Sequence, residues 1–435
     1  MNENTNTSVA LEKKSLAQWL SYLESIHPTE IDMGLARTKA VAETLGLSLS
    51  SSTVITVAGT NGKGTTCRFI EQALLAQGKS VAVYSSPHLV DYRERVRLNG
   101  ELPAESAFCN AFCAVEQARQ GTSLTYFEFG TLAGMKMMQD WQVDVAILEV
   151  GLGGRLDATN IIDPDLAVIT TIGLDHQDWL GDTREKIAIE KAGILRNGVK
   201  AVIGELDPPS TLVSEVERFN ADALWADKDF TVDSTKSDDW QWHCPLLNVS
   251  VSGLRFPSIP LQNASTAMAA LAHINCLPNE VRLKELTLNV AMPGRQHLVS
   301  ESPLIVVDVA HNPQATENLK QWLHTVKQSR SVTRTRFVVG MLKDKAIEET
   351  LVPLTNSNAC WYLANTQGTR GCSAQVLQDA LSRANVPAKD MFTYSKVLEA
   401  YNAAISDYTL GELIVVFGSF LTVADVLSQH SAYSE

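Results

Sequence analysis

The sequence contains no long apolar run. No stretch reaches the roughly 18 consecutive apolar residues of a membrane-spanning helix, so we expect no membrane segment and no membrane partner. The first residues, MNENTNTSVALEKK, are polar and lack the apolar core of a signal peptide, and we expect them to form a frayed tail.

Paired cysteines and an excess of basic residues are also missing. The seven cysteines show no Cys-x-x-Cys spacing, and Cys109 and Cys113 have no matching His or Cys pair for zinc. This usage indicates reduced thiols in a cytoplasmic protein. The net charge of −13 disfavours a nucleic-acid partner but leaves small anionic ligands open, because a few local cations can hold them.

The composition that remains is that of a folded protein with more than one core. The chain has 435 residues, of which 45% are hydrophobic and 20% charged, so we expect two or three globular domains. The first half alternates helical stretches with nearly continuous apolar runs, as parallel strands buried on both faces do. These runs are STVITVAG, SVAVYSS, VDVAILEVG, DLAVITTIG and VKAVIGE.

Two later segments interrupt this pattern before it resumes. Residues 206–260 alternate more and predict a small antiparallel excursion, after which we expect a helix with Asn263 as its N-cap. The stretch 291–303, in which Pro293-Gly294 breaks the helix, is the predicted linker. The fold class expected is α/β, with an N-terminal P-loop ATPase-like domain (1–296), a C-terminal Rossmann-like domain (297–435) and an active site in the cleft between them.

The strongest local signal is TVAGTNGKGTT, which begins at Thr56. A strand, a turn of small residues and a helix start place several backbone N–H groups on one concave face, Lys63 adds a charge, and Thr65 or Thr66 could reach Mg²⁺. The spacing departs from the usual phosphate loop, because Val57 replaces its first glycine and Gly64 separates Lys63 from the threonines. The alternative is a plain strand-to-helix turn.

Other polar residues follow the predicted buried strands of the first half. Glu149 ends one such strand, where a carboxylate needs a metal or a partner, and an ion pair with Arg155 is the alternative. The loop with Asp175, His176 and Asp178 follows another strand and either faces the cleft or is structural.

Three further patterns leave alternatives open. From spacing alone, Lys191 is a helix lysine that pairs with Glu190 or Glu185. The turn with Asp308 and His311 either carries chemistry or caps the next helix. The arginines at 93, 95 and 97 would share one face of a strand, where they meet an acidic ligand or solvent.

Ten motifs in order make the chain resemble the folylpolyglutamate synthase family and its bifunctional bacterial members. They are IDMGLAR, VAGTNGKGTT, VYSSPHLV, TYFEFGTL, ILEVGLGGRLDATN, DHQDWLG, EKAGI, PGRQHLV, DVAHNP and VFGSF. The resemblance accounts for the spacing of the loop, because this family and the Mur ligases use Gly-Thr-Asn-Gly-Lys-Gly-Ser/Thr.

The resemblance implies an ATP-dependent amide ligase. A folate-type carboxylate attacks the γ-phosphate of ATP, and the amino group of L-glutamate displaces phosphate from the acyl phosphate. The substrates implied are ATP, L-glutamate, dihydropteroate and reduced folates. Two Mg²⁺ ions are implied, a monovalent cation is a further candidate, and we expect a monomer.

The family's site residues transfer to this chain by position. The ATP residues implied are Gly59, Thr60, Asn61, Gly62, Lys63, Gly64, Thr65, Asn263, Arg295 and Asp308. The metal ligands implied are Ser86, Glu149, His176 and, as a carbamate, Lys191. The catalytic residues implied are Lys63, Lys191, His176 and His311. The pterin-site residues implied are Asp32, Met33, Gly34, Leu35, Thr125, Tyr126, Phe127, Glu128, Leu156, Asp157 and Ala158.

Three rival functions remain. A monofunctional folylpolyglutamate synthase would not use dihydropteroate, whereas IDMGLAR and TYFEF favour the bifunctional form. A Mur-type ligase is disfavoured, because the sequence before the phosphate loop is too short for a further domain. A non-catalytic folate- or nucleotide-binding switch would tolerate loss of Lys191, His176 and Asp308, all of which are present.

Overall fold

The computed structural model describes residues 14–29, 31–234, 239–355 and 358–430. Most of the polar start predicted to be a frayed tail therefore lies outside the described residues. The chain forms two compact units, one of residues 1–172, 183–257 and 261–290, the other of residues 173–182, 258–260 and 291–435. The domain boundary expected at 296/297 stays a prediction. Among the described helices, none has both the length and the hydropathy that crossing a membrane requires.

The first unit is built on a seven-stranded sheet of order β3-β2-β4-β1-β5-β6-β7. All neighbouring strands are parallel except β2 and β3. The strands are β1 Thr53–Ala58, β2 Val81–Tyr84, β3 Val96–Leu98, β4 Val145–Glu149, β5 Leu166–Ile169, β6 Lys200–Ile203 and β7 Asp222–Trp225. The central strands are buried along nearly their whole length, which explains why their apolar runs are continuous.

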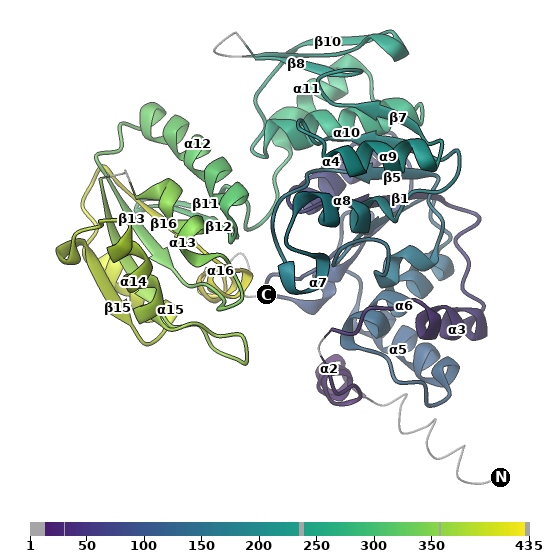
Figure 1. Ribbon diagram of the computed structural model, residues 1–435, viewed down its shortest axis with the longest axis horizontal. Coiled ribbons are helices and arrows are strands. Elements are labelled where there is room, and N and C mark those ends of the chain that lie inside the picture. The colour runs from purple at the N-terminus through teal and green to yellow at the C-terminus, as the bar shows by residue number, and fades with distance from the viewer. Residues whose placement is uncertain (1–13, 30, 235–238, 356–357, 431–435) are drawn as a thin grey trace. The chain divides into compact units, whose positions relative to one another are not determined.

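Helices cover this sheet (Figure 1), and apolar side chains of α2, α5 and α6 pack into one hydrophobic core with residues of the sheet. Trp19 of α2 is fully buried against Phe112 of α5 and Phe129 of α6, with ring centroids 5.7 and 6.4 Å away. The helices of this unit are α2 Leu16–Ser25, α3 Ala36–Leu45, α4 Lys63–Leu75, α5 Glu105–Arg119, α6 Tyr126–Trp141, α8 Arg184–Ala192, α9 Ser210–Arg218, α10 Leu261–His273 and α11 Glu280–Asn289, with 3-10 turns at Tyr92–Arg95, Ala158–Ile161 and Pro245–Leu247.

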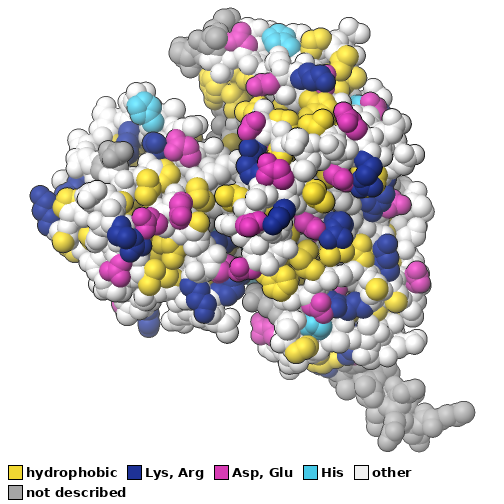
Figure 2. Space-filling view, viewed as in Figure 1, with side chains coloured by type: hydrophobic (Ala, Val, Ile, Leu, Met, Phe, Trp, Pro, Cys, Tyr) yellow, Lys and Arg dark blue, Asp and Glu magenta, His cyan; other side chains and the backbone are white. Residues whose placement is uncertain are grey.

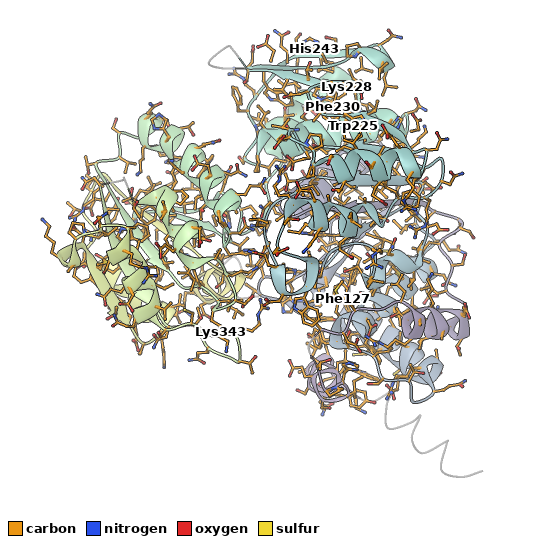
Figure 3. All side chains as sticks on the ribbon, in the orientation of Figure 1. Phe127, Trp225, Lys228, Phe230, His243 and Lys343 are labelled. Carbon is orange, nitrogen blue, oxygen red and sulfur yellow. The ribbon has the colours of Figure 1, made fainter. Side chains whose placement is uncertain are left out.

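The antiparallel excursion is smaller than predicted. Its three strands, in the order β10-β9-β8, are β8 Thr231–Asp233, β9 Trp240–Cys244 and β10 Val249–Leu254. The earlier part of 206–260 instead forms α9 and β7, which extend the parallel sheet, because β7 pairs with β6. Phe230 and the strand of His243 belong to this region (Figure 3), and Trp242 is buried against Phe230 with ring centroids 6.3 Å apart.

The second unit carries a six-stranded sheet of order β11-β12-β16-β13-β14-β15, in which only β11 is antiparallel to its neighbour. The strands are β11 His297–Glu301, β12 Leu304–Asp308, β13 Arg334–Val339, β14 Ala359–Ala364, β15 Met391–Tyr394 and β16 Glu412–Phe417. The helices are α7 Gln177–Leu180, α12 Pro313–Ser329, α13 Ile347–Leu351, α14 Ala374–Arg383, α15 Val397–Ser406 and α16 Phe420–Leu427, with 3-10 turns at Val352–Leu354 and Ala388–Asp390. The predicted α/β fold class is confirmed.

Three local predictions are wrong. The stretch 291–303 is not a plain linker, because β11 within it pairs with β12. The helix at 263 begins at Leu261, directly after Pro260, so Asn263 lies in its first turn and does not cap it. Residues 92–97 do not form one strand; Tyr92–Arg95 is a 3-10 turn and only 96–98 is extended.

On the face shown in Figure 2, acidic and basic side chains are interspersed on each unit.

Candidate active site

The loop between β1 and α4 requires glycine at two positions. Gly62 precedes α4 in the left-handed conformation, with φ 86°. A Cβ on Gly62 would lie 2.9 Å from Cγ of Asn263, and one on Gly59 would lie 3.1 Å from Cβ of Thr170. The glycines therefore allow the loop to pack closely against β5 and α10 while the helix start keeps its N–H groups together.

Side chains around the loop hold it in place. Nζ of Lys63 donates to the carbonyl oxygens of Gly59 and Thr60 at 3.0 and 3.3 Å. Nδ2 of Asn263 donates to Oγ1 of Thr65 at 2.7 Å, which brings two predicted ATP residues from distant helices together. The other candidate hydroxyl, that of Thr66, is buried and has no hydrogen-bond partner within the described part of the chain.

Two predicted metal ligands lie on strands beside this loop. Strands β2, β4 and β1 are parallel neighbours, and Glu149 at the end of β4 is in register with Val57 of β1. Ser86 follows β2, so its backbone and that of Glu149 reach the same edge of the sheet as the loop. Glu149 is only 6% exposed. The alternative pairing of Glu149 with Arg155 is wrong, because the guanidinium of Arg155 pairs with Glu190 at 2.7 Å.

Lys191 is also placed near the end of β4. It lies in the last turn of α8 and is 3% exposed. The loop that follows β4 is fastened to this turn, since the backbone N–H of Arg155 donates to the carbonyl oxygen of Glu190 at 2.7 Å. A Cβ on Gly154 would lie 2.7 Å from that same oxygen. Lys191 is therefore a buried lysine beside the loop that follows Glu149, and Glu190, one of its two expected helix partners, pairs instead with Arg155.

The predicted pterin residues Asp32 and Glu128 are joined by Arg37. Nε of Arg37 donates to both carboxylate oxygens of Glu128 at 2.9 Å, and Nη1 pairs with Asp32. Glu128 also accepts from Thr38 and from the backbone N–H of Thr125, which caps α6. Glu128 is 3% exposed and its oxygens are engaged within the protein, so the geometry favours a supporting role. Met33, Gly34 and Leu35 lie between Asp32 and α3 and are partly exposed.

The other predicted pterin residues lie beside the loop after β4. A Cβ on Gly151 would lie 2.7 Å from Cε2 of Phe127, so the loop and this ring pack together. Asp157 accepts from the backbone N–H groups of Gly151 and Leu152, at 3.1 and 2.8 Å. Burial raises the pKa of Asp157, although these hydrogen bonds oppose the increase. Asp157 therefore shapes the loop in which Leu156 is half-buried and Ala158 buried.

The arginines at 93, 95 and 97 do not share a face. Nη2 of Arg93 pairs with Asp91 at 2.7 Å, and Nη2 of Arg97 pairs with the fully buried Glu71 of α4 at 3.0 Å. Nε of Arg95 donates to Nδ1 of His88 at 2.9 Å, and its guanidinium lies 5.6 Å from the ring centroid of Tyr126. The alternating spacing of the three arginines did not predict their positions, because a 3-10 turn replaces the expected strand.

In the second unit, Asp308 and Arg295 lie together at the end of β12. Asp308 accepts from the backbone N–H groups of Gln296 and Ala310, each at 2.8 Å. Burial raises the pKa of Asp308, and the charge of Arg295 opposes the increase. The guanidinium of Arg295 lies 5.2 Å from the ring centroid of Phe420. The helix after this strand is capped by Asn312, whose Oδ1 accepts from Ala315 at 2.9 Å.

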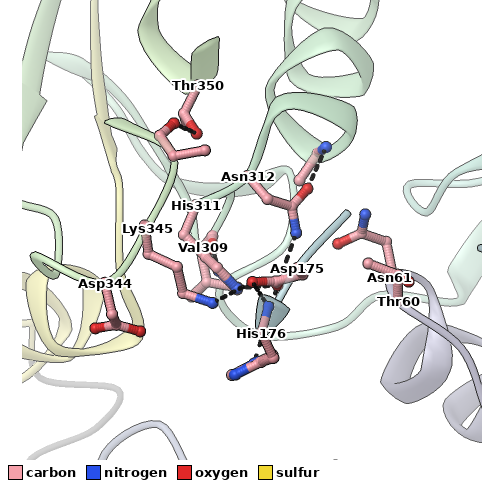
Figure 4. Close-up of polar contacts among 12 residues, drawn as sticks. Thr60, Asn61, Asp175, His176, Val309, His311, Asn312, Asp344, Lys345 and Thr350 are labelled. Atoms are coloured by element: carbon pink, nitrogen blue, oxygen red, sulfur yellow. Dashed lines mark hydrogen bonds and ion pairs between the residues drawn. The ribbon is translucent and has the colours of Figure 1, made fainter. Parts of the chain in front are cut away.

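A buried carboxylate in the same unit, Asp175, gathers four side chains (Figure 4). Its Oδ1 accepts from Nζ of Lys345 at 2.7 Å, and its Oδ2 accepts from Nδ2 of Asn312 at 3.2 Å. Nε2 of His311 and of His176 lie 3.6 and 4.0 Å from Oδ2. Burial alone would raise the pKa of Asp175, but the nearby imidazole of His311 and the charge of Lys345 outweigh it, so the pKa lies well below its usual range. Asp178 lies in the first turn of the short helix α7 in this segment, and His176 is its N-cap residue.

Several residues of these clusters have no role in the sequence-based prediction. Lys345 contacts Asp175 across 170 positions of sequence, and Arg37 contacts Glu128 across 91. Thr170 and Thr171 follow the apolar run of β5 and bind the phosphate loop. The hydroxyl of Thr170 donates a hydrogen bond to the carbonyl oxygen of Asn61, and the hydroxyl of Thr171 accepts one from the backbone N–H of Asn61. The position of the two threonines at a strand end is a signal that could have found them. No comparable pattern marks Lys345, whose partner is set by tertiary structure. Among the described residues, no three His, Cys, Asp or Glu side chains are grouped as metal ligands usually are.

Comparison with known proteins gives a family match for each part of the chain. Residues 57–273 match the Mur ligase middle domain, and residues 294–420 match the Mur ligase glutamate ligase domain. Escherichia coli (strain K12) dihydrofolate synthase/folylpolyglutamate synthase is 43% identical to this chain over 412 residues, which cover 95% of this chain and 94% of the relative.

Two solved structures are similar over nearly the whole chain. Escherichia coli FolC in complex with DHPP and ADP is 42% identical with a TM-score of 0.91, and the match covers 98% of this chain and 99% of that one. A bifunctional folylpolyglutamate synthase/dihydrofolate synthase with Mn, AMPPNP and L-glutamate bound is 43% identical with a TM-score of 0.88, covering 96% and 98%. The resemblance found in the ten motifs is confirmed. The chain therefore belongs to the dihydrofolate synthase/folylpolyglutamate synthase family of the Mur ligases.

Proposed function

We propose that this protein is an ATP-dependent ligase that adds L-glutamate to dihydropteroate, giving dihydrofolate, and to reduced folates, giving folylpolyglutamates. The observation that carries the proposal is the grouping of predicted site residues at the C-terminal ends of the strands of the first sheet. There the Gly59–Gly62 loop and the start of α4 lie beside the strand ends that carry Ser86 and Glu149. This arrangement suits a nucleotide phosphate with a divalent cation.

The chemistry requires a leaving group. A carboxylate is a poor acyl donor, because its leaving group would be oxide. Transfer of the γ-phosphoryl group from ATP to a carboxylate oxygen gives an acyl phosphate and ADP. The amine of glutamate then attacks the acyl carbon, phosphate leaves, and the amine loses a proton. Lys63 and the N–H groups at the start of α4 would hold the phosphates, and Asn263 orients Thr65 toward them.

The proposed metal ligands have suitable chemistry. Mg²⁺ prefers oxygen donors, and Ser86 and Glu149 supply a hydroxyl and a carboxylate at one edge of the sheet. Lys191 would add oxygen donors only as a carbamate, and its burial beside the loop that follows Glu149 supports that role. His176 is also proposed as a metal ligand. The bound ions would neutralise the charge of two reacting anions.

The remaining roles are proposed from position. Arg295 and Asp308 would contact ATP, and His311 the glutamate or phosphate side. The pterin would meet Tyr126, Phe127 and the loop of Leu156 and Ala158, whereas Glu128 and Asp157 support this surface from within. We further propose a cytoplasmic location, which is supported by the seven cysteines, none of which forms a disulfide in the described part of the chain.

The test measures phosphate release by the purified protein with ATP, Mg²⁺ and L-glutamate. We expect release with dihydropteroate and, in a separate reaction, with a reduced folate, each dependent on glutamate. Release with only the reduced folate would identify a monofunctional folylpolyglutamate synthase. A protein that binds ATP and folate but releases no phosphate with either would be a non-catalytic binding protein.

Two lysine variants make this assay specific for the phosphate loop. Lys63→Met removes the charge at the loop and should abolish both activities. Lys79→Met removes an exposed lysine just beyond α4 and should leave both unchanged. Turnover by Lys63→Met at the wild-type rate would contradict the assignment of this loop.

A further inference from the structure

We propose that Lys345 is a positioning residue that acts through Asp175 to fix the segments that carry His176 and His311. The inference rests on the proposed function, in which those two histidines serve the reaction. It concerns a residue that has no role in the sequence-based prediction, and all of its contacts described below lie within the second unit.

The loop that carries Lys345 is held on a rigid support. It follows β13, and Leu342 forms a bridge with Gly371 of the neighbouring loop. The backbone N–H of Lys343 donates to the carbonyl oxygen of Arg370 at 3.0 Å. The guanidinium of Arg370 in turn pairs with Asp344 at 2.6 Å. The backbone of Lys345 is therefore fixed, and its side chain extends from a defined point.

The side chain of Lys345 ends in a buried ion pair. Its Nζ lies 2.7 Å from Oδ1 of Asp175, and the two side chains are 5% and 10% exposed. Removing one member of such a pair leaves an unpaired charge in a region of low dielectric, which is strongly unfavourable. Asp175 would then shift or draw in water, and its other hydrogen bonds would change with it.

The other contacts of Asp175 hold both the segment that carries His176 and the segment that carries His311. The Oδ1 atom of Asp175 also accepts the backbone N–H of His176 at 2.9 Å, and His176 has a left-handed backbone with φ 52°. This conformation is unfavourable for a residue with a Cβ, so a local hydrogen bond is needed to hold it. The Oδ2 atom of Asp175 contacts Asn312 and lies 3.6 Å from His311. Lys345 thus sets the position of a carboxylate that orients two proposed active-site segments (Figure 4).

The consequence is expected in metal binding. Removing a residue that orients a metal ligand typically lowers metal affinity or activity 10- to 100-fold. We therefore expect Lys345→Met to weaken the binding of Mn²⁺, as a probe for Mg²⁺, by at least about tenfold, with a comparable loss in kcat.

The experiment uses the full-length protein and two readouts. Wild-type protein is first assayed for glutamate-dependent phosphate release, which tests the proposed function by itself. Mn²⁺ binding in the presence of a non-hydrolysable ATP analogue is then measured by electron paramagnetic resonance. The variants are Lys345→Met and, as a matched control from the same loop, the exposed Lys343→Met. We expect weakened Mn²⁺ binding only in Lys345→Met. Wild-type Mn²⁺ affinity in a folded Lys345→Met protein would overturn the inference and leave the proposed function intact.

A double variant separates positioning from stability. Asp175→Asn combined with Lys345→Met removes both charges, so it should recover much of the stability that Lys345→Met loses. The amide has one acceptor oxygen where the carboxylate has two, so it cannot accept both from the backbone N–H of His176 and from Nδ2 of Asn312. We expect a well-folded protein that still binds Mn²⁺ weakly, and this variant is measured instead if Lys345→Met does not fold. Wild-type Mn²⁺ binding by the double variant would show that the pair is only structural.

Discussion

Single residues in this fold carry strict steric and electrostatic requirements, and Gly62 is the clearest case. It combines a left-handed backbone with close contact to Asn263, whereas Gly78 has φ 78° but open space around it. Both positions penalise a Cβ by about 1–2 kcal/mol for the backbone alone. Only at Gly62 must the loop and α10 also move apart.

We expect Gly62→Ala to lose about 100-fold in kcat/KM for ATP, because a displacement near 1 Å at a positioning loop has that effect. The matched variant Gly78→Ala should lose stability and keep its activity. Steady-state kinetics and thermal unfolding of both variants test this prediction. Equal activity in the two would show that the contact with Asn263 does not matter.

The His88 side chain gives a pH dependence with a defined sign. Burial and the charge of Arg95 lower its pKa from 6.5 to about 4. Between these values the unfolded chain binds a proton that the folded protein does not, so stability falls as the pH decreases from about 6.5 to about 4. The contribution is at most about 3.4 kcal/mol over this range.

His88→Gln should reduce that loss, because an amide oxygen can still accept from Arg95 and does not titrate. Urea unfolding of wild type and variant at several pH values between 7 and 4 measures the difference. We expect the two stability curves to converge toward low pH, where the wild type has lost its advantage. Parallel curves would contradict the assignment to His88.

At the scale of elements, a buried ion pair joins the phosphate-loop helix to the edge of the sheet. Glu71 of α4 is fully buried, and Arg97 of β3 donates to both of its oxygens at 3.0–3.2 Å. Arg68 adds a third donor at 3.0 Å. Arg97 also reaches the hydroxyl of Ser85, next to Ser86.

Replacing Glu71 by Gln should destabilise the protein by about 3 kcal/mol or more, because two guanidinium groups lose their carboxylate. Glu280, which pairs with Lys284 on an exposed helix face, provides the control, and Glu280→Gln should change stability by less than about 1 kcal/mol. Chemical denaturation of both variants measures the free energies. A similar small effect in both would show that the Glu71 cluster is not a structural anchor.

Strands could be predicted from the sequence where nearly every residue of the strand is buried. The apolar runs that became β1, β4, β5, β12 and β16 are buried on both sides, so their composition alone indicated strands. The arginine stretch at 92–97 was not predictable in this way, because a 3-10 turn and a three-residue strand are too short to impose a period. Asn263 was misplaced because Pro260, and not a side-chain cap, precedes the helix.

For the whole molecule, the sequence predicted chemistry better than contacts. The motifs predicted site roles for the phosphate loop, Glu149 and Asp308, because each lies at the C-terminal end of a strand, where parallel sheets bind ligands. The partners of these residues come from distant parts of the chain, such as Lys345 for Asp175 and Arg37 for Glu128, and pairwise spacing cannot reveal them. Metal ligation, carbamylation of Lys191 and a monomeric state stay predictions.

The central claim is that a carboxylate is activated by phosphorylation before glutamate reacts. It is tested by supplying dihydropteroate with ¹⁸O in both carboxylate oxygens, together with ATP, Mg²⁺ and L-glutamate, and analysing the products by mass spectrometry. We predict dihydrofolate that retains one ¹⁸O and inorganic phosphate that carries the other, because the bridging oxygen leaves with phosphate. Dihydrofolate formed with no ¹⁸O in the phosphate, or no dihydrofolate at all, would contradict this account.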